Sequence, residues 1–194
     1  MGYIPSLYTN NYGLFIKPIS LGDYESALGK IKFIEPLPHQ MNSDTFEVKI
    51  TFDEDIIEPK ISYTKSQHGL EVLTAQPLYD FIEGESEEEL DEALAKFINE
   101  DVEVEDVVIE NKGGAHFGVH PLKTSATLKE TDVFVEKAGT KYLFKIGDLI
   151  GPQMEMYQED GEERQLDIEM TYNHSYYRTM IFNIPEGYQI KNLD

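Results

Sequence analysis

The strongest constraint on the fold is an alternation of apolar and polar residues with a period of two. In "TFEVKITFD", Phe46, Val48, Ile50 and Phe52 alternate with polar or charged residues, and "QLDIEMTY" repeats the pattern at 165–172. Such alternation puts one face of a strand on a core and the other in water, as in antiparallel sheets. The sequence therefore predicts a mainly β protein of the α+β type, with antiparallel, sandwich-like sheets.

Shorter stretches of similar character are also predicted as strands. They are 14–19, 29–35, 60–65, 70–82, 102–111, 125–130, 132–137, 141–146 and 177–184. "KAGT" predicts a hairpin with Gly139 at positive φ. In "IPEG", Pro185 at the first central position and Gly187 at the fourth predict a type I turn. The stretches 165–172, 177–184 and 188–192 are then expected to form a meander.

One helix is expected at 86–98, "SEEELDEALAKFI". Ser86 followed by Glu89 has the spacing of a capping box, with Ser86 as the N-cap. Apolar residues recur along one stripe, which should pack on a sheet. The stripe consists of Leu90, Leu94, Phe97 and Ile98.

The glycine pair Gly113-Gly114 suggests a division of the chain into two parts. The first part, 1–112, would hold the helix and its following strand. The second part, 113–194, would be the meander. A single continuous domain is the alternative, because 194 residues are enough for one large core.

Composition excludes several classes of function. The chain has 37 acidic and 16 basic residues and a formal charge of −21. This charge repels phosphate backbones and anionic membrane surfaces, so nucleic acid is not an expected partner. Without cysteine, neither disulfides nor a thiol nucleophile can form. No apolar run approaches the roughly 18 residues of a membrane span, and "MGYIPSLYTN" lacks the basic and apolar regions of a signal peptide.

Two histidines form the sharpest candidate metal pair, His116 and His120 in "GGAHFGVHP". On a helix, their spacing of four would bring both rings to one face. Several breakers, including Gly118 and Pro121, argue against a helix, and on a strand the rings would lie roughly 13 Å apart. We therefore predict a loop here, and neither a metal site nor a cofactor.

Carboxylates and tyrosines are too numerous to define a site by themselves. Residues 83–110 hold 13 acids and one base, which could form a calcium surface or simply a solvated face. A pair of carboxylates could in principle hydrolyse glycosides. The 12 tyrosines could line a groove for sugar or peptide, or simply fill strands. No nucleophile elbow, P-loop or dinucleotide motif is present, so no catalytic residue is assigned.

Several stretches nevertheless resemble a known family. "FKIGDLIGPQMEMYQE" and "RQLDIEMTYNHSYYRTMIFNIPEGYQIKNL" resemble the C-terminal region of large transglutaminase-like proteins from Bacteroidetes. "GLEVLTAQPLYDFI" resembles the interior of that region. "GYIPSLYTNNYGLFI" resembles the stretch that follows the catalytic Asp of the core. The resemblance covers most of the chain and is weakest over 110–130.

This resemblance implies a non-catalytic accessory β domain in an exported transglutaminase-like protein. The Cys, His and Asp of such a core would lie upstream of Met1, so the chain is not expected to be an enzyme. The expected partner is the core of the parent protein, at the cell surface or in the periplasm, with peptide, protein or glycan as further candidates. A free-standing carbohydrate- or peptide-binding module is the main alternative, and a carboxylate-dependent hydrolase the weaker one.

The resemblance also bears on the chain end. The last strand, 188–192, is expected to continue in a longer polypeptide. A sheet cut at that strand would expose an unpaired edge, through which two copies could associate.

Overall fold

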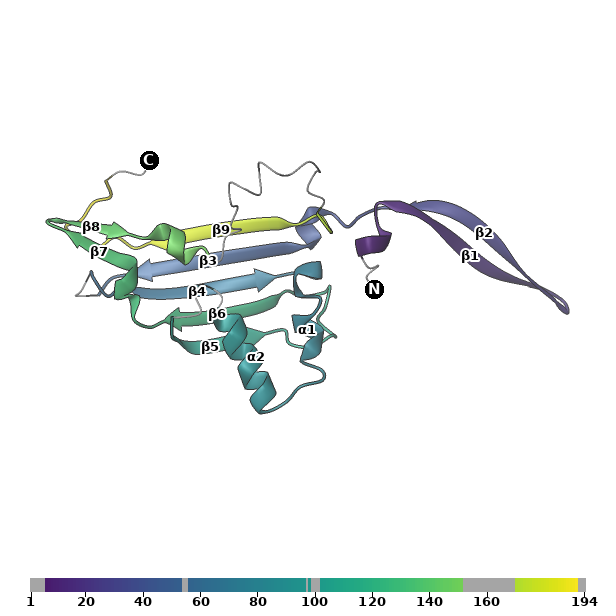
Figure 1. Ribbon diagram of the computed structural model, residues 1–194, viewed down its shortest axis with the longest axis horizontal. Helices are drawn as coiled ribbons and strands as arrows, with labels where there is room; N and C mark the ends of the chain where they lie inside the picture. Colours follow the sequence, from purple (N-terminus) through teal and green to yellow (C-terminus); the bar gives the residue numbers. More distant parts are fainter. Residues whose placement is uncertain (1–5, 54–55, 97, 99–101, 152–169, 192–194) are drawn as a thin grey trace, which may run out of the picture.

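The computed structural model describes residues 6–53, 56–96, 98, 102–151 and 170–191 (Figure 1). Nine strands, two α-helices and five short 3-10 helices lie in this part of the chain. The strands are β1 (Asn11–Leu21), β2 (Tyr24–Ile34), β3 (Ser43–Thr51), β4 (Lys60–Gln67), β5 (Val104–Glu110), β6 (Leu122–Leu128), β7 (Val135–Ala138), β8 (Lys141–Phe144) and β9 (Ser175–Phe182). The α-helices are α1 (Ala75–Leu78) and α2 (Glu85–Ala95), and the 3-10 helices are η1 (Ser6–Tyr8), η2 (His39–Met41), η3 (Gly69–Val72), η4 (Thr131–Phe134) and η5 (Ile146–Leu149).

A five-stranded sheet forms the body of the molecule, in the order β5-β6-β4-β3-β9 (Figure 1). The pairs are antiparallel except for β3 and β9, which run parallel. The mainly β, α+β fold class is thus confirmed, with a mixed rather than purely antiparallel sheet. The sheet takes strands from both 1–112 and 113–194, as in a single continuous domain.

The core lies on one face of this sheet. Alternate residues of β3 are buried, and Phe46, Val48 and Ile50 are at most 1% exposed, so the period of two in the sequence selects the core face. Helix α2 packs on this face through Ala95, and the tyrosine hydroxyl of Tyr63 donates to the carbonyl of that residue. The core is completed by Ile61, Ile98, Val102, Ala126, Leu128, Phe134 and Leu149.

The helix predicted at 86–98 is confirmed, but its bounds differ, since α2 spans Glu85–Ala95. Helix α2 begins at Glu85, and Gly84 is its N-cap, with no side-chain capping bond. Gly84 adopts φ 62° and ψ −130°, a conformation that favours glycine, and its carbonyl accepts from Glu87 N and Glu88 N. The capping box that we predicted at Ser86 is therefore wrong, because the backbone has already entered the helix there.

The strand predicted at 70–82 is wrong. This stretch forms η3 and α1 instead. Gly69 adopts φ 67° at the first residue of η3, and Pro77 lies inside α1, so both residues disfavour a continuous strand. Gln76 is fully buried, and its side-chain amide donates to the carbonyls of Asn111 and His120. These contacts with distant residues hold the stretch in place, although Leu73, Leu78 and Phe81 remain exposed.

The C-terminal meander is only partly present. The hairpin at "KAGT" is confirmed as β7 and β8 around Gly139, which has φ 66°. Strand β9 confirms the prediction at 177–184. Of the strand predicted at 165–172, residues 165–169 lie outside the described residues, and 170–172 are not in a strand. The prediction of a third strand at 188–192 is wrong, because residues 188–191 form no strand. Instead, the ring of Tyr188 packs on the ring of Tyr142 in β8.

The turn before Tyr188 is displaced by one residue from its predicted position. Tyr188 N donates to the carbonyl of Pro185. Gly187 is thus the third residue of the turn, with φ 86°. A type II turn requires positive φ at this position, so glycine sets the register in place of proline.

A long hairpin, which we call the arm, extends from one end of the body (Figure 1). Strands β1 and β2 pair along all 11 residues, from Asn11 with Ile34 to Leu21 with Tyr24. Gly22, at φ 62°, begins the two-residue turn at the tip. The strands predicted at 14–19 and 29–35 are therefore confirmed and extended. No other helix or strand of the described chain packs extensively on the arm.

Among the described residues, no helix is long and apolar enough to cross a membrane.

Candidate functional site

The arm presents two chemically different faces. Residues opposite each other in an antiparallel pair share a face, so the register assigns every side chain. We call the first side the apolar face; it consists of Tyr12, Leu14, Ile16, Pro18, Ser20, Glu25, Ala27, Gly29, Ile31 and Phe33. Its one charged residue, Glu25, lies beside the turn at the tip. Four of its large side chains are between 63% and 71% exposed: Tyr12, Leu14, Ile16 and Ile31.

The opposite side, which we call the lysine face, carries all three basic residues of the arm. Lys17, Lys30 and Lys32 alternate there with further exposed apolar side chains, including Phe15, Leu21, Tyr24 and Leu28. Lys32 lies over the ring of Phe15, 5.1 Å from its centroid, a distance typical of a cation–π contact. The arm has three basic and two acidic residues, a net charge of +1, whereas the remaining 13 basic and 35 acidic residues give −22.

A buried cluster of charges lies at the end of the sheet near the arm. Asp44 of β3 is 3% exposed and faces the core. Its carboxylate accepts from Arg178 Nη1 at 2.8 Å and from Gln67 Nε2 at 3.0 Å, and it lies 3.6 Å from Lys65 Nζ. Three strands, β3, β4 and β9, therefore meet at one carboxylate.

Burial shifts the pKa of Lys65 in this cluster and the pKa values of two nearby groups, Glu71 and Tyr172. It lowers the pKa of the Lys65 ammonium to about 8, although Asp44 acts in the opposite direction. Burial also raises the pKa of the Glu71 carboxyl, against the opposing charge of His174, and raises the pKa of the Tyr172 phenol to about 12. Glu71 Oε1 is buried without a hydrogen-bond partner among the described residues.

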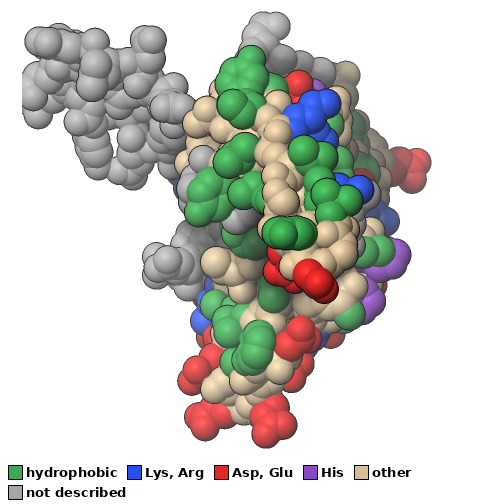
Figure 2. Space-filling view, turned by 90° about the vertical axis from the view of Figure 1, so that its right-hand side faces the viewer, with side chains coloured by type: hydrophobic (Ala, Val, Ile, Leu, Met, Phe, Trp, Pro, Cys, Tyr) green, Lys and Arg blue, Asp and Glu red, His purple; other side chains and the backbone are tan. Residues whose placement is uncertain are grey.

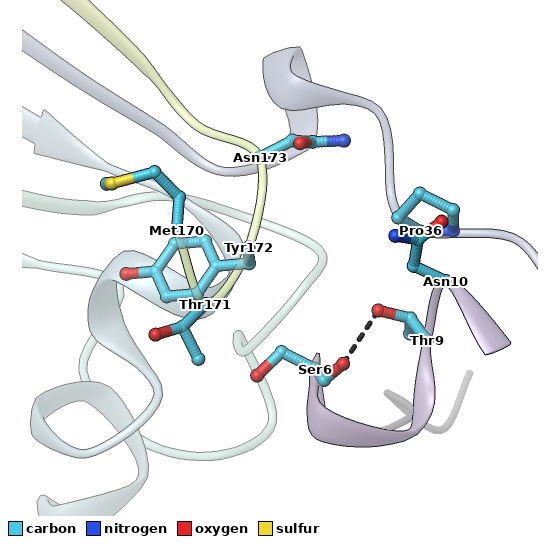
Figure 3. A pocket seen from close by; sticks show the side chains of 8 residues that line it. All are labelled: Ser6, Thr9, Asn10, Pro36, Met170, Thr171, Tyr172 and Asn173. Atoms are coloured by element: carbon cyan, nitrogen blue, oxygen red, sulfur yellow. Dashed lines mark hydrogen bonds between the residues drawn. The ribbon is translucent and has the colours of Figure 1, made fainter. Parts of the chain in front are cut away.

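A hollow of about 490 Å³ lies between the base of the arm and the start of β9. Figure 3 shows Ser6, Thr9, Asn10 and Pro36 on one side and Met170, Thr171, Tyr172 and Asn173 on the other. The described lining includes hydroxyls, amides and one aromatic ring but no carboxylate. Its chemistry suits a neutral polar molecule better than a cation.

The histidine pair is closer than the sequence suggested. His120 N donates to the carbonyl of His116, and the two ring centroids are 5.6 Å apart. The predicted loop is confirmed, because residues 113–120 form turns and no helix, and a single turn between His116 and His120 brings the two rings together. The Asp80 carboxylate accepts from Gly114 N at the start of the turn, and Gly118 adopts φ 71° near its end, so glycines bound one turn without preventing it.

Many carboxylates of the acidic stretch are paired with lysines. Lys112 contacts Glu87 at 2.6 Å and Asp91 at 2.7 Å, and Lys96, the C-cap of α2, contacts Glu92. In the described part of the chain, no group of three or more His, Asp or Glu side chains is placed to hold a metal ion. The structure therefore adds no ligand set to the histidine pair.

Sequence reasoning missed both the charged cluster and the arm. A signal for the cluster was present, because Asp44 lies in phase with Phe46 and Lys65 in phase with Tyr63, on the core side of each strand. A charged residue in phase with an apolar stripe must find a partner when the strand is buried. The signal for the arm was different. Its strands carry apolar residues at both odd and even positions, so both faces of the hairpin are apolar.

Comparisons with family models, with curated proteins and with solved structures find no match to this chain.

Proposed function

We propose that this chain is a non-catalytic accessory β domain of an exported transglutaminase-like protein and that it docks on protein surfaces through its arm. The observation that carries the docking role is the arm itself. It extends from a body with its own core and exposes large apolar side chains on both faces. A soluble protein exposes a patch of this kind mainly where another surface covers it.

The link to transglutaminase-like proteins rests on the resemblance of the sequence stretches around "IGP" and "IPEGY". The chain also has no cysteine to act as the nucleophile of such a core. In this role the body is a scaffold, and the ion cluster at Asp44 holds β9 in the sheet beside the base of the arm.

Two measurements test the proposal. The purified chain should show neither amide hydrolysis nor amide exchange on glutamine peptides, and turnover by the chain alone would refute the non-catalytic role. In a longer protein that includes an upstream Cys–His–Asp core, the arm should protect part of its surface from hydrogen exchange. If arm variants leave all binding to protein partners unchanged, the docking role is wrong.

A glycan- or peptide-binding module is a second candidate, which the hollow beside Tyr172 favours. Hydroxyl and amide groups surround one aromatic ring there, a combination that suits sugars or peptide backbones. Titration calorimetry with cell-wall glycans and peptides should then detect saturable binding that Tyr172→Ala abolishes. Tyr24→Ala at the tip of the arm is the control and should leave this binding intact.

A carboxylate-dependent hydrolase is the weakest candidate. The raised pKa of Glu71 and its proximity to the charge of Asp44 favour it. However, neither carboxylate is among the described residues that line the hollow. Hydrolysis of a glycoside by the purified chain, lost in Glu71→Gln, would support this function over the other two.

A further inference from the structure

We propose that the apolar face of the arm binds the same face of a second copy of this chain, giving a twofold dimer of arms. The inference rests on the proposed docking role of the arm and names the partner for one of its faces. It differs from association through the edge of the sheet, because side chains rather than backbone groups make the contact.

The arm needs a second surface to cover it. An isolated two-stranded hairpin is at best marginally stable in water. Here each strand has 11 residues, and Leu14, Ile16 and Ile31 are each at least 63% exposed. Tyr12 and Phe33 already pack edge to face on this side, with ring centroids 5.3 Å apart, so the face is ordered as well as apolar.

The charge of the molecule also favours contact through the arms. The whole chain carries −21, which opposes contact between two bodies. The arm carries +1 and projects away from the body (Figure 1). Two copies can therefore meet along their arms while their acidic bodies remain apart. Figure 2, which views the molecule from the side of the arm, shows hydrophobic side chains over this end and acidic side chains gathered below them.

The charges on the two faces of the arm favour one face and one orientation for the contact. Pairing of two lysine faces would bring together two sets of Lys17, Lys30 and Lys32, whereas the apolar face has only Glu25, at the tip. A twofold axis across the arms makes them antiparallel and uses the same patch on both copies. The two Glu25 carboxylates then lie at opposite ends of the contact, and so do the two bodies.

The available area is sufficient for a weak dimer. Face-to-face packing of two sheets interdigitates side chains across about 10 Å. Covering five large side chains on each copy would bury on the order of 1,000 Å² in total, near the lower limit for specific interfaces. Such an interface is consistent with dissociation constants of about 1–100 μM.

Matched variants on the two faces test the dimer by sedimentation equilibrium of the whole chain. Leu14 on the apolar face and Leu28 on the lysine face are both 64% exposed. We expect the unmodified chain and Leu28→Lys to dimerise in this concentration range and Leu14→Lys to remain monomeric. A monomeric unmodified chain, a dimeric Leu14→Lys, or loss of the dimer in both variants would overturn the proposal.

Cross-linking gives a second readout that does not depend on a disruptive charge. Because the chain has no cysteine, one introduced thiol reports one position. Ile16→Cys should give a covalent dimer with a short bis-maleimide, whereas Leu28→Cys should not; the reverse result would place the contact on the wrong face. A chain that stays monomeric but binds a protein partner through its arm would refute the dimer and leave the proposed function standing, whereas turnover would refute that function whatever the oligomeric state.

Discussion

At the scale of single residues, Asp44 is a position in the body that requires several hydrogen-bond donors. It is a buried carboxylate at the end of a strand whose other core-facing side chains are apolar. Donors from β4 and β9 satisfy it, and Arg178 also donates to its backbone carbonyl at 3.0 Å. The planar guanidinium lies over the rings of Phe46 and Tyr176. A buried charge is tolerated only with such partners, so this residue links β9 to the rest of the sheet.

Asp44→Asn should therefore destabilise the fold strongly. It removes the negative charge that faces both Lys65 and Arg178, and breaking a buried pair in this way costs about 3–5 kcal/mol. Urea unfolding followed by circular dichroism measures the loss. Glu47→Gln, on the exposed side of the same strand, is the control and should change stability by less than about 0.5 kcal/mol. Equal effects of the two variants would contradict the role of Asp44.

The lowered pKa of Lys65 predicts that stability rises on going from about pH 8 toward pH 10. Between the folded pKa of about 8 and the ordinary value of 10.5, the unfolded chain binds more protons than the folded one. Stability increases with pH under that condition. Three charged groups act on this ammonium: Asp44 and Glu71 raise the pKa of Lys65, and Arg178 lowers it.

Lys65→Met should flatten this dependence. Unfolding free energies of both proteins from pH 7 to 9.5 would test it, since buried tyrosines begin to oppose folding only at higher pH. The expected gain in the unmodified chain is on the order of 1–3 kcal/mol over this window. A flat profile in the unmodified chain, or the same slope in both, would show that Lys65 is not buried as a cation.

At the scale of elements, α2 begins at a different residue in the structure than the sequence pattern predicts. The pattern favours Ser86 as the N-cap, but the structure uses Gly84 in a conformation with positive φ. The acidic residues Glu85, Glu87 and Glu88 still lie in the first turn, where they favour the positive end of the helix dipole. A shift of the N-cap by two residues therefore leaves the electrostatics of the helix start intact.

Alanine substitutions at the two positions should differ accordingly. Gly84→Ala forces a β-carbon into a glycine conformation and should cost about 1–3 kcal/mol. Ser86→Ala should cost less than about 0.5 kcal/mol, because no side-chain cap is lost. Thermal unfolding measures both. A larger loss of stability for Ser86→Ala than for Gly84→Ala would support the capping box that the sequence predicted.

Local patterns were informative where they repeated and misleading where they did not. The alternation at 46–52 located β3 and its core face, and the stripe at 90–98 located α2 on that face. The prediction of a strand at 70–82 failed because the stretch forms η3 and α1, and Gln76 in α1 is buried with its hydrogen-bond partners at Asn111 and His120. Contacts with residues more than 30 positions away are not visible in a local period.

At the scale of the whole molecule, arm and body are separate structures. All the residues of the core cluster come from the body, between Phe46 and Phe182. The arm strands pair with each other, and their ends lie side by side, since Asn10 N donates to the carbonyl of Ile34 at 2.8 Å. Regions with few buried apolar contacts contribute little to global stability, so the arm is free to serve an interaction.

Removal of the arm should leave the body folded. Replacing 11–34 by a short glycine-containing turn should change the unfolding free energy of the body by less than about 1 kcal/mol, the size of an ordinary point mutation. Chemical denaturation measures this change, and the cooperative transition should persist. Loss of that transition would show that the arm is part of the folding unit.

The sequence by itself determined the secondary-structure class, the core face of the central strands, the amphipathic helix and the strongly negative net charge. These properties follow from the order of neighbouring residues and from composition. Only the tertiary structure decided that β9 runs parallel to β3, that Asp44, Lys65 and Arg178 share one buried site, and that β1 and β2 leave the body as an arm. These features depend on which distant segments become neighbours, and that choice minimises the free energy of the whole chain rather than of any stretch within it.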